Sequence, residues 1–314
     1  MARAALYLTV AAVAAALCGV PWLATEDWFD ARLQTLRDLA SEEEPIAVIV
    51  DLRAAGRWPL ERGAIARMAS AAIDGGARAV GIEVDMSHAT STSDDTALAE
   101  LVKREPRIVP LALMGVTSDS VDSLGFVYNE NASLAGVRCA SEPAPFALRV
   151  ARSAGASTSD IGSGCSTGLL RPYLQVRNGV PILDVVLLEQ ETTTAVRGKV
   201  VLFGTLDPLT SVRTYSGTHA ATYVNAAIVN GAIRKQWRTS GLTFSIAVCL
   251  VVVLGMWLVA GSHASTARLI VASVVLLSIL IAARLWVWFP LIPASLSLAL
   301  LSGIEAIRPA WMQR

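Results

Sequence analysis

The chain has 314 residues, of which 54% are hydrophobic and only 17% charged, and its mean hydropathy is +0.52. This composition is too apolar for an ordinary soluble enzyme, so a membrane protein is the first expectation. Lysine plus arginine and aspartate plus glutamate are equal, at 26 each. The balance argues against a strongly basic surface for nucleic acid and against an acidic solvating tail.

Four segments are long and apolar enough to cross a bilayer, which takes about 20 residues. They are residues 4–25, 242–260, 267–283 and 285–304. The first could be a cleavable signal peptide, but its apolar run exceeds the usual signal core, which favours an uncleaved anchor. Most tryptophans lie at or near the ends of these segments, as in an aromatic belt. We therefore expect one transmembrane helix before the soluble region and three after it.

Basic residues indicate the orientation of these helices. Arg3, Arg268 and Arg308 would all be cytoplasmic with the amino terminus inside, whereas the basic residues at 234–238 disagree with that arrangement. Large translocated domains weaken the charge rule, so we keep the assignment. The expected parts are an amino-terminal helix (1–25), an extracytoplasmic domain (26–238), three transmembrane helices (239–305) and a cytoplasmic tail (306–314). The tail after Ile304 is too short for a folded output domain.

The outer region alternates between strand and helix patterns. In chain order, the pattern predicts a strand at 46–52, a helix at 61–74, a strand at 79–84, a helix at 94–103, strands at 108–113 and 125–128, a helix at 144–154, a weak strand at 173–176, a helix at 182–189, a strand at 199–205 and a helix at 220–230. The glycine- and serine-rich residues 153–168 are typical of a loop. Apolar strands separated by helices predict an α/β domain with a largely parallel sheet.

One motif matches an enzyme. The sequence GCSTG at 164–168 fits the nucleophile elbow of α/β-hydrolases, with Ser166 followed by Asp184 or Asp207 and then His219. That chemistry needs a strand running directly into the elbow, and the preceding residues are GASTSDIGS. A serine hydrolase is therefore the least favoured of the readings kept open.

The sequence carries no recognisable motif for a metal or a cofactor. The histidines, His88, His219 and His263, are scattered, and the sequence has no zinc-protease motif and no paired C-x-x-C. No Walker A loop or dinucleotide glycine pattern occurs. We expect a protein that is not an enzyme and that has no catalytic residues, no metal and no cofactor.

Acidic residues end several predicted strands. In open α/β sheets, ligands bind in the crevice outside the carboxyl ends of the strands. The acids could form a polar pocket facing Arg62 or a structural ion-pair network, and Trp58 with Pro59 could be a rigid cap or a stacking platform. The candidate ligand-binding residues are Asp51, Trp58, Arg62, Glu83, Asp95 and Asp207, with Asp85 nearby.

Two cysteines, Cys139 and Cys165, fall in the same outer region. In an oxidising compartment they could pair and constrain the intervening loop, at a gain of roughly 3 kcal/mol. The alternative is two unrelated thiols. We keep the disulfide as the expectation.

Several stretches together resemble the CHASE-type extracellular sensory domain, second class. They are EDWFDARLQTLR after the first apolar segment, IAVIVD with GRWPLERG, GARAVGIEVD, DDTALAEL, VRGKVVLFGT and YVNAAIVNG. The resemblance implies bacterial origin and one membrane helix before the domain and three after it. The matching positions are Asp51, Trp58, Pro59, Arg62, Asp95, Gly198, Lys199, Gly204 and Asn225. The chain departs from the family at Glu83, where Asp is more usual, at Tyr223, where His is more usual, and in a shortened loop at 207–217.

The resemblance implies a sensory module in the bacterial inner membrane. We expect it to pass a signal through its helices to a separate effector chain, with the lipid bilayer, an effector or complex subunit and a second copy of itself as partners. Nucleic acid is not an expected partner. The alternative is a structural or assembly subunit of a membrane complex.

Overall fold

The computed structural model describes residues 8–13, 44–53, 61–84, 86, 92–111, 124, 126–128, 134–139, 144–157, 169–170, 180–184, 195–207, 211–214, 217–235, 242–259, 273–275 and 277–278. The chain divides into two compact units. One unit contains Met1–Arg37 and Thr239–Arg314, and the other contains Asp38–Arg238.

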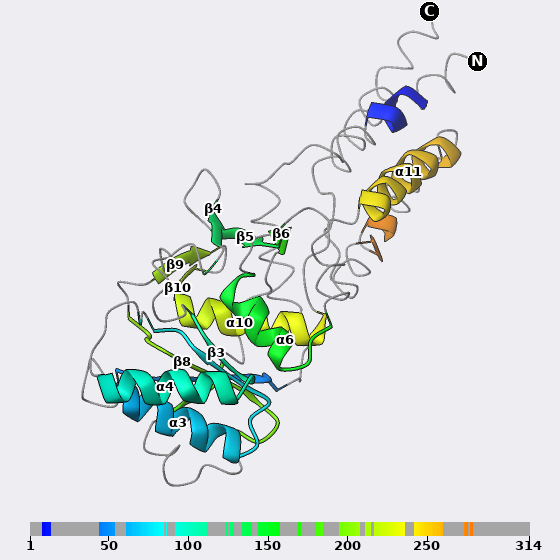
Figure 1. Ribbon diagram of the computed structural model, residues 1–314. Coiled ribbons are helices and arrows are strands. Elements are labelled where there is room, and N and C mark those ends of the chain that lie inside the picture. Colours follow the sequence, from blue (N-terminus) through cyan, green and yellow to red (C-terminus); the bar gives the residue numbers. More distant parts are fainter. Residues whose placement is uncertain are drawn as a thin grey trace, which may run out of the picture. The chain divides into compact units, whose positions relative to one another are not determined.

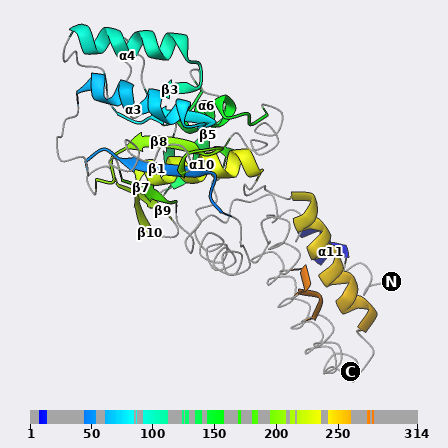
Figure 2. The same ribbon diagram turned by 90° about the horizontal axis from the view of Figure 1, so that it is seen from below.

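A five-stranded parallel sheet forms the centre of the unit Asp38–Arg238 (Figure 1). Its strand order is β3-β2-β8-β1-β7, and β8, β1 and β7 can be followed as neighbours in Figure 2. The last strand of this sheet in chain order, β8, pairs with both β1 and β2. The strands are β1 (Ala47–Asp51), β2 (Ala79–Ile82), β3 (Ile108–Pro110), β7 (Ile182–Leu183) and β8 (Val200–Gly204).

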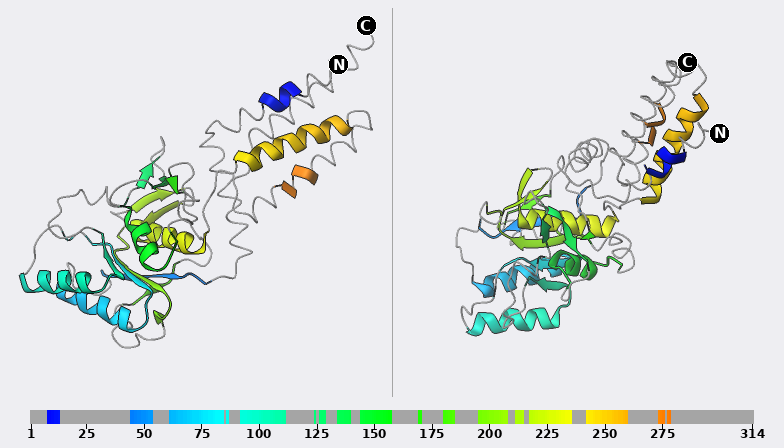
Figure 3. Two further views of the ribbon diagram at one scale, coloured as in Figure 1. Left: turned by 45° about the vertical axis from the view of Figure 1, so that its right-hand side comes forward. Right: turned by 90° about the horizontal axis from the view of Figure 1, so that it is seen from above.

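Two pairs of helices cover the two faces of this sheet (Figure 3). Helices α3 (Arg62–Asp74) and α4 (Thr92–Arg104) pack together on one face. Helices α6 (Phe146–Ser153) and α10 (Ala221–Arg234) pack together on the other. The domain is therefore a three-layer α/β/α sandwich.

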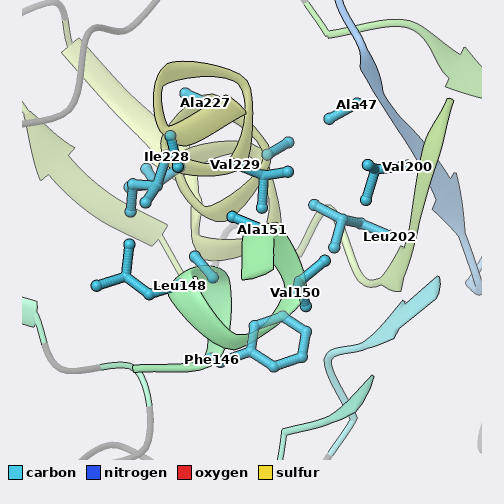
Figure 4. Close-up of a cluster of buried hydrophobic side chains, with 14 of the residues drawn as sticks. Ala47, Phe146, Leu148, Val150, Ala151, Val200, Leu202, Ala227, Ile228 and Val229 are labelled. Atoms are coloured by element: carbon cyan, nitrogen blue, oxygen red, sulfur yellow. The ribbon is translucent and has the colours of Figure 1, made fainter. Parts of the chain in front are cut away.

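Strand β8 shows why the sheet needs helices on both faces. Its five residues are all buried, and successive side chains of a strand point to opposite faces. Val201 and Phe203 join the core under α3 and α4. Val200 and Leu202 join the core under α6 and α10, where Figure 4 shows them facing side chains of both helices. A continuous apolar run is the sequence mark of a strand buried on both sides.

Two smaller sheets complete the described part of this unit. Strands β4 (Phe126–Tyr128), β5 (Leu134–Arg138) and β6 (Leu169–Leu170) form an antiparallel sheet in the order β4-β5-β6. Strands β9 (Ser211–Thr214) and β10 (Gly217–Ala220) form a hairpin that leads directly into α10. The hairpin therefore lies in the chain between the end of β8 and the start of α10.

The predicted elements are confirmed at β1, β2, β3, β4, β8, α3, α4, α6 and α10, and the mostly parallel sheet is confirmed with them. The helix predicted at 182–189 is wrong at its start, because Ile182–Leu183 form edge strand β7 beside β1. Two apolar residues after a proline fit either element, and pairing with β1 decides the outcome. The strand predicted at 173–176 lies outside the described residues.

The unit of Met1–Arg37 and Thr239–Arg314 contains helix α11 (Leu242–Val259), at the position of the second predicted membrane segment. Within the ranges that the structure describes, no helix reaches both the length and the apolar character needed to cross a bilayer. The other three predicted segments lie mostly outside those ranges. The arrangement of four membrane helices therefore remains a prediction.

Candidate functional site

The carboxyl ends of the parallel strands meet at one edge of the central sheet. Strand β1 ends at Asp51, β2 is followed by Glu83, and β8 ends at Gly204. The strand register places Asp51 beside Gly204, and Glu83 N donates a hydrogen bond to Phe203 O. Helix α10 begins at Ala221, and its first turn contacts this edge through Thr222. This is the edge where open α/β folds bind ligands.

Glycine at position 204 permits a close contact between β8 and α10. A Cβ atom at Gly204 would overlap Oγ1, Cγ2 and Cβ of Thr222. The Thr222 hydroxyl donates to the Thr205 carbonyl over 3.2 Å. Any larger residue at position 204 would push the start of α10 away from the sheet.

Behind this contact lies a buried polar pair, Glu83 and Asn225. Asn225 is 0% exposed, and neither its amide nitrogen nor its amide oxygen has a hydrogen-bond partner among the described residues. The Glu83 residue is partly exposed, but its Oε2 atom is shielded from solvent and is likewise unpartnered. Asn225 and Thr222 are close enough to influence the Glu83 carboxyl without giving Oε2 a bond of normal geometry.

The protonation of Glu83 reflects this setting. Burial raises the pKa of the Glu83 carboxyl from 4.5 to about 7, and the neighbouring Asn225 and Thr222 side chains limit the rise. No charged neighbour contributes to this pKa. Glu83 is thus a buried acid without a cationic partner, which is typical of functional sites.

The structure places Arg62 elsewhere, on the opposite face of the sheet. Its Nη1 lies 2.6 Å from Asp95 Oδ1, and its Nη2 donates to the Met86 carbonyl over 2.9 Å. Arg62 is buried at the start of α3, so the pair joins α3, α4 and the segment after β2. Arg62 and Asp95 form a structural ion pair, and they do not meet the Glu83 carboxyl.

Asp51 and Asp207 form a third group. Oδ1 of Asp51 accepts hydrogen bonds from Arg53 N over 3.1 Å and from Leu206 N over 3.4 Å. Nη1 of Arg53 lies 2.7 Å from Asp207 Oδ2. Asp51 therefore fixes the turn after β1 against the segment after β8. The predicted set of acids is divided into three groups and does not form one pocket around Arg62.

His219, the general base in the serine hydrolase hypothesis, forms an aromatic stack with Tyr223. The rings of His219 and Tyr223 lie 5.1 Å apart at an interplanar angle of 17°. Partial burial lowers the pKa of His219, so the imidazole is neutral at pH 7. Ser166 lies outside the described residues, so the serine hydrolase reading is untested.

Some predicted residues cannot be placed. Trp58, Pro59, Asp85 and Cys165 lie outside the described residues. The pairing of Cys139 with Cys165 therefore stays a prediction. Within the described ranges, no group of three or more histidine, cysteine, aspartate or glutamate side chains is arranged to hold a metal ion.

Asn225 and Thr222 were not among the candidate site residues predicted from the sequence. Asn225 appeared only as a position shared with the resembling family. Its signal in the sequence is a polar side chain on the buried side of a mostly apolar helix, ATYVNAAIVNGAIR. A buried asparagine usually has hydrogen-bond partners, so this position calls for an explanation.

Replacing Arg62 should be far more costly than replacing Arg53. The Arg62 and Asp95 side chains are 5% and 15% exposed, whereas Arg53 is 45% exposed in its pair with Asp207. We expect Arg62→Ala to destabilise the domain by about 3–5 kcal/mol, because it removes the buried cation that bonds the shielded Asp95 carboxylate. We expect Arg53→Ala to cost less than about 1 kcal/mol. Chemical denaturation of the two variants measures both values, and equal losses would contradict the structural role of Arg62.

Replacing Glu83 by glutamine should change how stability depends on pH. A carboxyl whose pKa is higher in the folded than in the unfolded chain loses stability as pH rises between those two values. Relative to the wild type, Glu83→Gln should therefore gain stability from about pH 4.5 to about pH 7 and then level off, with a total of up to about 3 kcal/mol.

Thermal unfolding of the full chain in detergent at pH 5, 6, 7 and 8 measures this difference. The matched control is Glu105→Gln, because the hydrogen bond from Arg107 lowers the pKa of Glu105. The difference between this control and the wild type should be flat from pH 5 to 8. A flat difference for Glu83→Gln as well would show that Glu83 is not a buried, unpaired acid.

Comparison with known proteins identifies the family of the chain. The family model described as CHASE2 domain matches residues 8–262, which is more than half of the chain. No curated protein and no solved structure matches the chain significantly. CHASE2 domains are sensory domains. The chain therefore belongs to the CHASE2 domain family.

Proposed function

We propose that the chain is a membrane-anchored extracytoplasmic sensory module that passes a signal through its helices to an effector on a separate chain. Membership of a sensory domain family supports the sensory part of this proposal. The observation that carries it in the structure is the set of shielded atoms without hydrogen-bond partners, Glu83 Oε2 and both amide atoms of Asn225, at the ligand-binding edge of the sheet. Such a set of atoms stabilises no fold by itself and is suited to receive a ligand.

Helix α10 links this edge to the opposite end of the sheet. Asn225 lies in its first half, and Asn230 lies one to two turns further along. Oδ1 of Asn230 accepts hydrogen bonds from Ile46 N over 2.9 Å and from Ala47 N over 2.7 Å. Arg234 in the last turn donates to the Glu44 carbonyl. The end of α10 is therefore bound to the start of β1.

This link suggests how a signal could leave the domain. The chain enters the domain just before β1 and leaves it just after α10, on its way to α11. A ligand that bonds Asn225 would bias the position of α10, and the bonds of Asn230 and Arg234 would move the entering and leaving segments together. A ligand acts in this way only if it binds the two positions with different affinity.

The proposal includes a location. The predicted membrane helices, one before the domain and three after it, would anchor the chain in the bilayer of a bacterial inner membrane with the CHASE2 domain outside. A second copy of the chain is a further proposed partner. The positive-inside distribution of arginine supports this orientation.

Isolation of the protein from native membranes tests the proposal. The tagged full chain would be cross-linked in the membrane, extracted in mild detergent and purified, and the co-purified proteins would be identified by mass spectrometry. We expect a membrane protein that carries a kinase, cyclase or similar effector domain. The matched control is Asn230→Leu, which removes the hydrogen bonds that Ile46 N and Ala47 N donate to Asn230. This variant should still co-purify with the effector, but the effector should no longer respond to the signal.

A different set of co-purified proteins would contradict the proposal. An eluate that contains only further copies of the chain, or only structural membrane proteins, would contradict signalling to a separate effector. That result would support the alternative function, a structural or assembly subunit of a membrane complex.

A further inference from the structure

We infer that Glu83 and Asn225 bind a small organic ammonium ion, with Glu83 Oε2 and Asn225 Oδ1 accepting hydrogen bonds from its nitrogen. The inference names the ligand class of the proposed sensory site and rests on the proposed function for its biological role. The binding itself can be measured without any effector.

The two asparagines of α10 differ in their bonding. Asn230 is 9% exposed, and its oxygen accepts two backbone hydrogen bonds. Asn225 is 0% exposed, and no described residue bonds either polar atom of its amide. A buried polar group without a hydrogen-bond partner destabilises the fold. Burial of the Asn225 amide therefore destabilises the fold, whereas burial of the Asn230 amide does not. Hydrogen bonds from a bound ligand would remove this destabilisation.

The charges at this edge favour a cation as the ligand. Three acids, Asp51, Glu83 and Asp207, lie at the ends of β1, β2 and β8. Of the described basic residues at this edge, Arg53 is bonded to Asp207, and Arg149 of α6 donates through Nη2 to the Leu111 carbonyl after β3. Neither contributes to the pKa of Glu83. Arg62 is committed to Asp95 on the other face of the sheet. An anion would thus approach a carboxyl without a compensating cation. A cation would give Glu83 the opposite charge that it lacks.

The geometry favours an ammonium ion over a metal ion. Calcium takes six to eight oxygen ligands, and magnesium takes six. In the described part of the chain no cluster of three acids, histidines or cysteines offers such a shell. An ammonium group needs only two or three acceptors at hydrogen-bond distance. The amide nitrogen of Asn225 remains as a donor, which suits a hydroxyl or carbonyl oxygen next to the ammonium group.

The binding should depend on pH through Glu83. The titratable and charged groups around this edge are Asp51 after β1, Arg53 with Asp207, Arg149 of α6 on the Leu111 carbonyl, and His219 on β10. Partial burial lowers the pKa of His219, which therefore stays neutral near pH 7. Glu83, whose pKa burial raises to about 7, is the group that changes charge there. An ammonium ion should bind its ionised form, so affinity should fall about tenfold for each pH unit below 7.

Three probes of similar size and different charge test the inference. They are ethanolamine, which carries an ammonium group and a hydroxyl, neutral ethylene glycol and anionic glycolate. Binding to the full chain in detergent micelles would be measured by thermal shift and isothermal titration at pH 8 and pH 6, at constant ionic strength with sodium chloride. We expect saturable binding of ethanolamine at pH 8 and about tenfold weaker binding at pH 6.

The variants separate binding from folding. Glu83→Gln keeps the shape of the side chain and should abolish ethanolamine binding at pH 8. Asn225→Ala should weaken binding at least fivefold. Glu105→Gln, the same chemical change at a carboxyl bonded to Arg107 before β3, should leave binding unchanged. Circular dichroism and the unfolding temperature without probe establish that each variant is folded.

Three results would overturn the inference: no saturable ethanolamine binding at pH 8, equal binding in folded Glu83→Gln, or tighter binding of glycolate than of ethanolamine. These failures are distinguishable from failure of the proposed function. Loss of probe binding with an effector still co-purified would reject the ligand class alone. Ethanolamine binding without any effector would reject the signalling proposal alone.

Discussion

The close contact between Gly204 and Thr222 is the constraint on which the rest of this domain depends. It allows the first turn of α10 to lie directly on the carboxyl edge of the central strand β8. Strand β8 pairs with both β1 and β2, so the same contact fixes α10 relative to the residues that end all three strands. It also brings Asn225 to Glu83, and in this way a packing requirement at a glycine creates a polar site.

Helix α10 then combines two roles that are usually separate. Near its start, Asn225 presents unpartnered polar atoms at the edge where ligands bind. Near its end, Asn230 and Arg234 bind the segment that leads into β1. Because Thr222 bonds the start of α10 to Thr205 and Asn230 and Arg234 bond its end, the two ends of the helix do not move independently, which suits the proposed transmission of a shift. The two asparagines of α10 thus differ: Asn230 has hydrogen-bond partners, and the amide of Asn225 has none in the described structure.

The sequence predicted the α/β class and the strong elements because continuous apolar runs and helical periodicity are local signals. Strand β7 was mistaken for a helix because two residues carry too little periodicity and the pairing partner, β1, is far away in sequence. The acids at strand ends were located correctly, but their pairing was not. Arg62 bonds Asp95 on one face while Glu83 points to the other, and this depends on strand register, which no motif records. Asn225 was not predicted as a site residue, because its distinguishing feature is the absence of hydrogen-bond partners in the described structure, which a sequence does not show.

The central claim is that Glu83 is a buried carboxyl without a cationic partner at the ligand-binding edge. Infrared difference spectroscopy of the full chain, with Glu83→Gln to assign the signal, tests it most directly by following the protonated carboxyl band across pH. With a pKa of about 7, the Glu83 band should be present at pH 6 and disappear around pH 7 to 8. A Glu83 carboxyl that is already fully ionised at pH 6 would contradict the account.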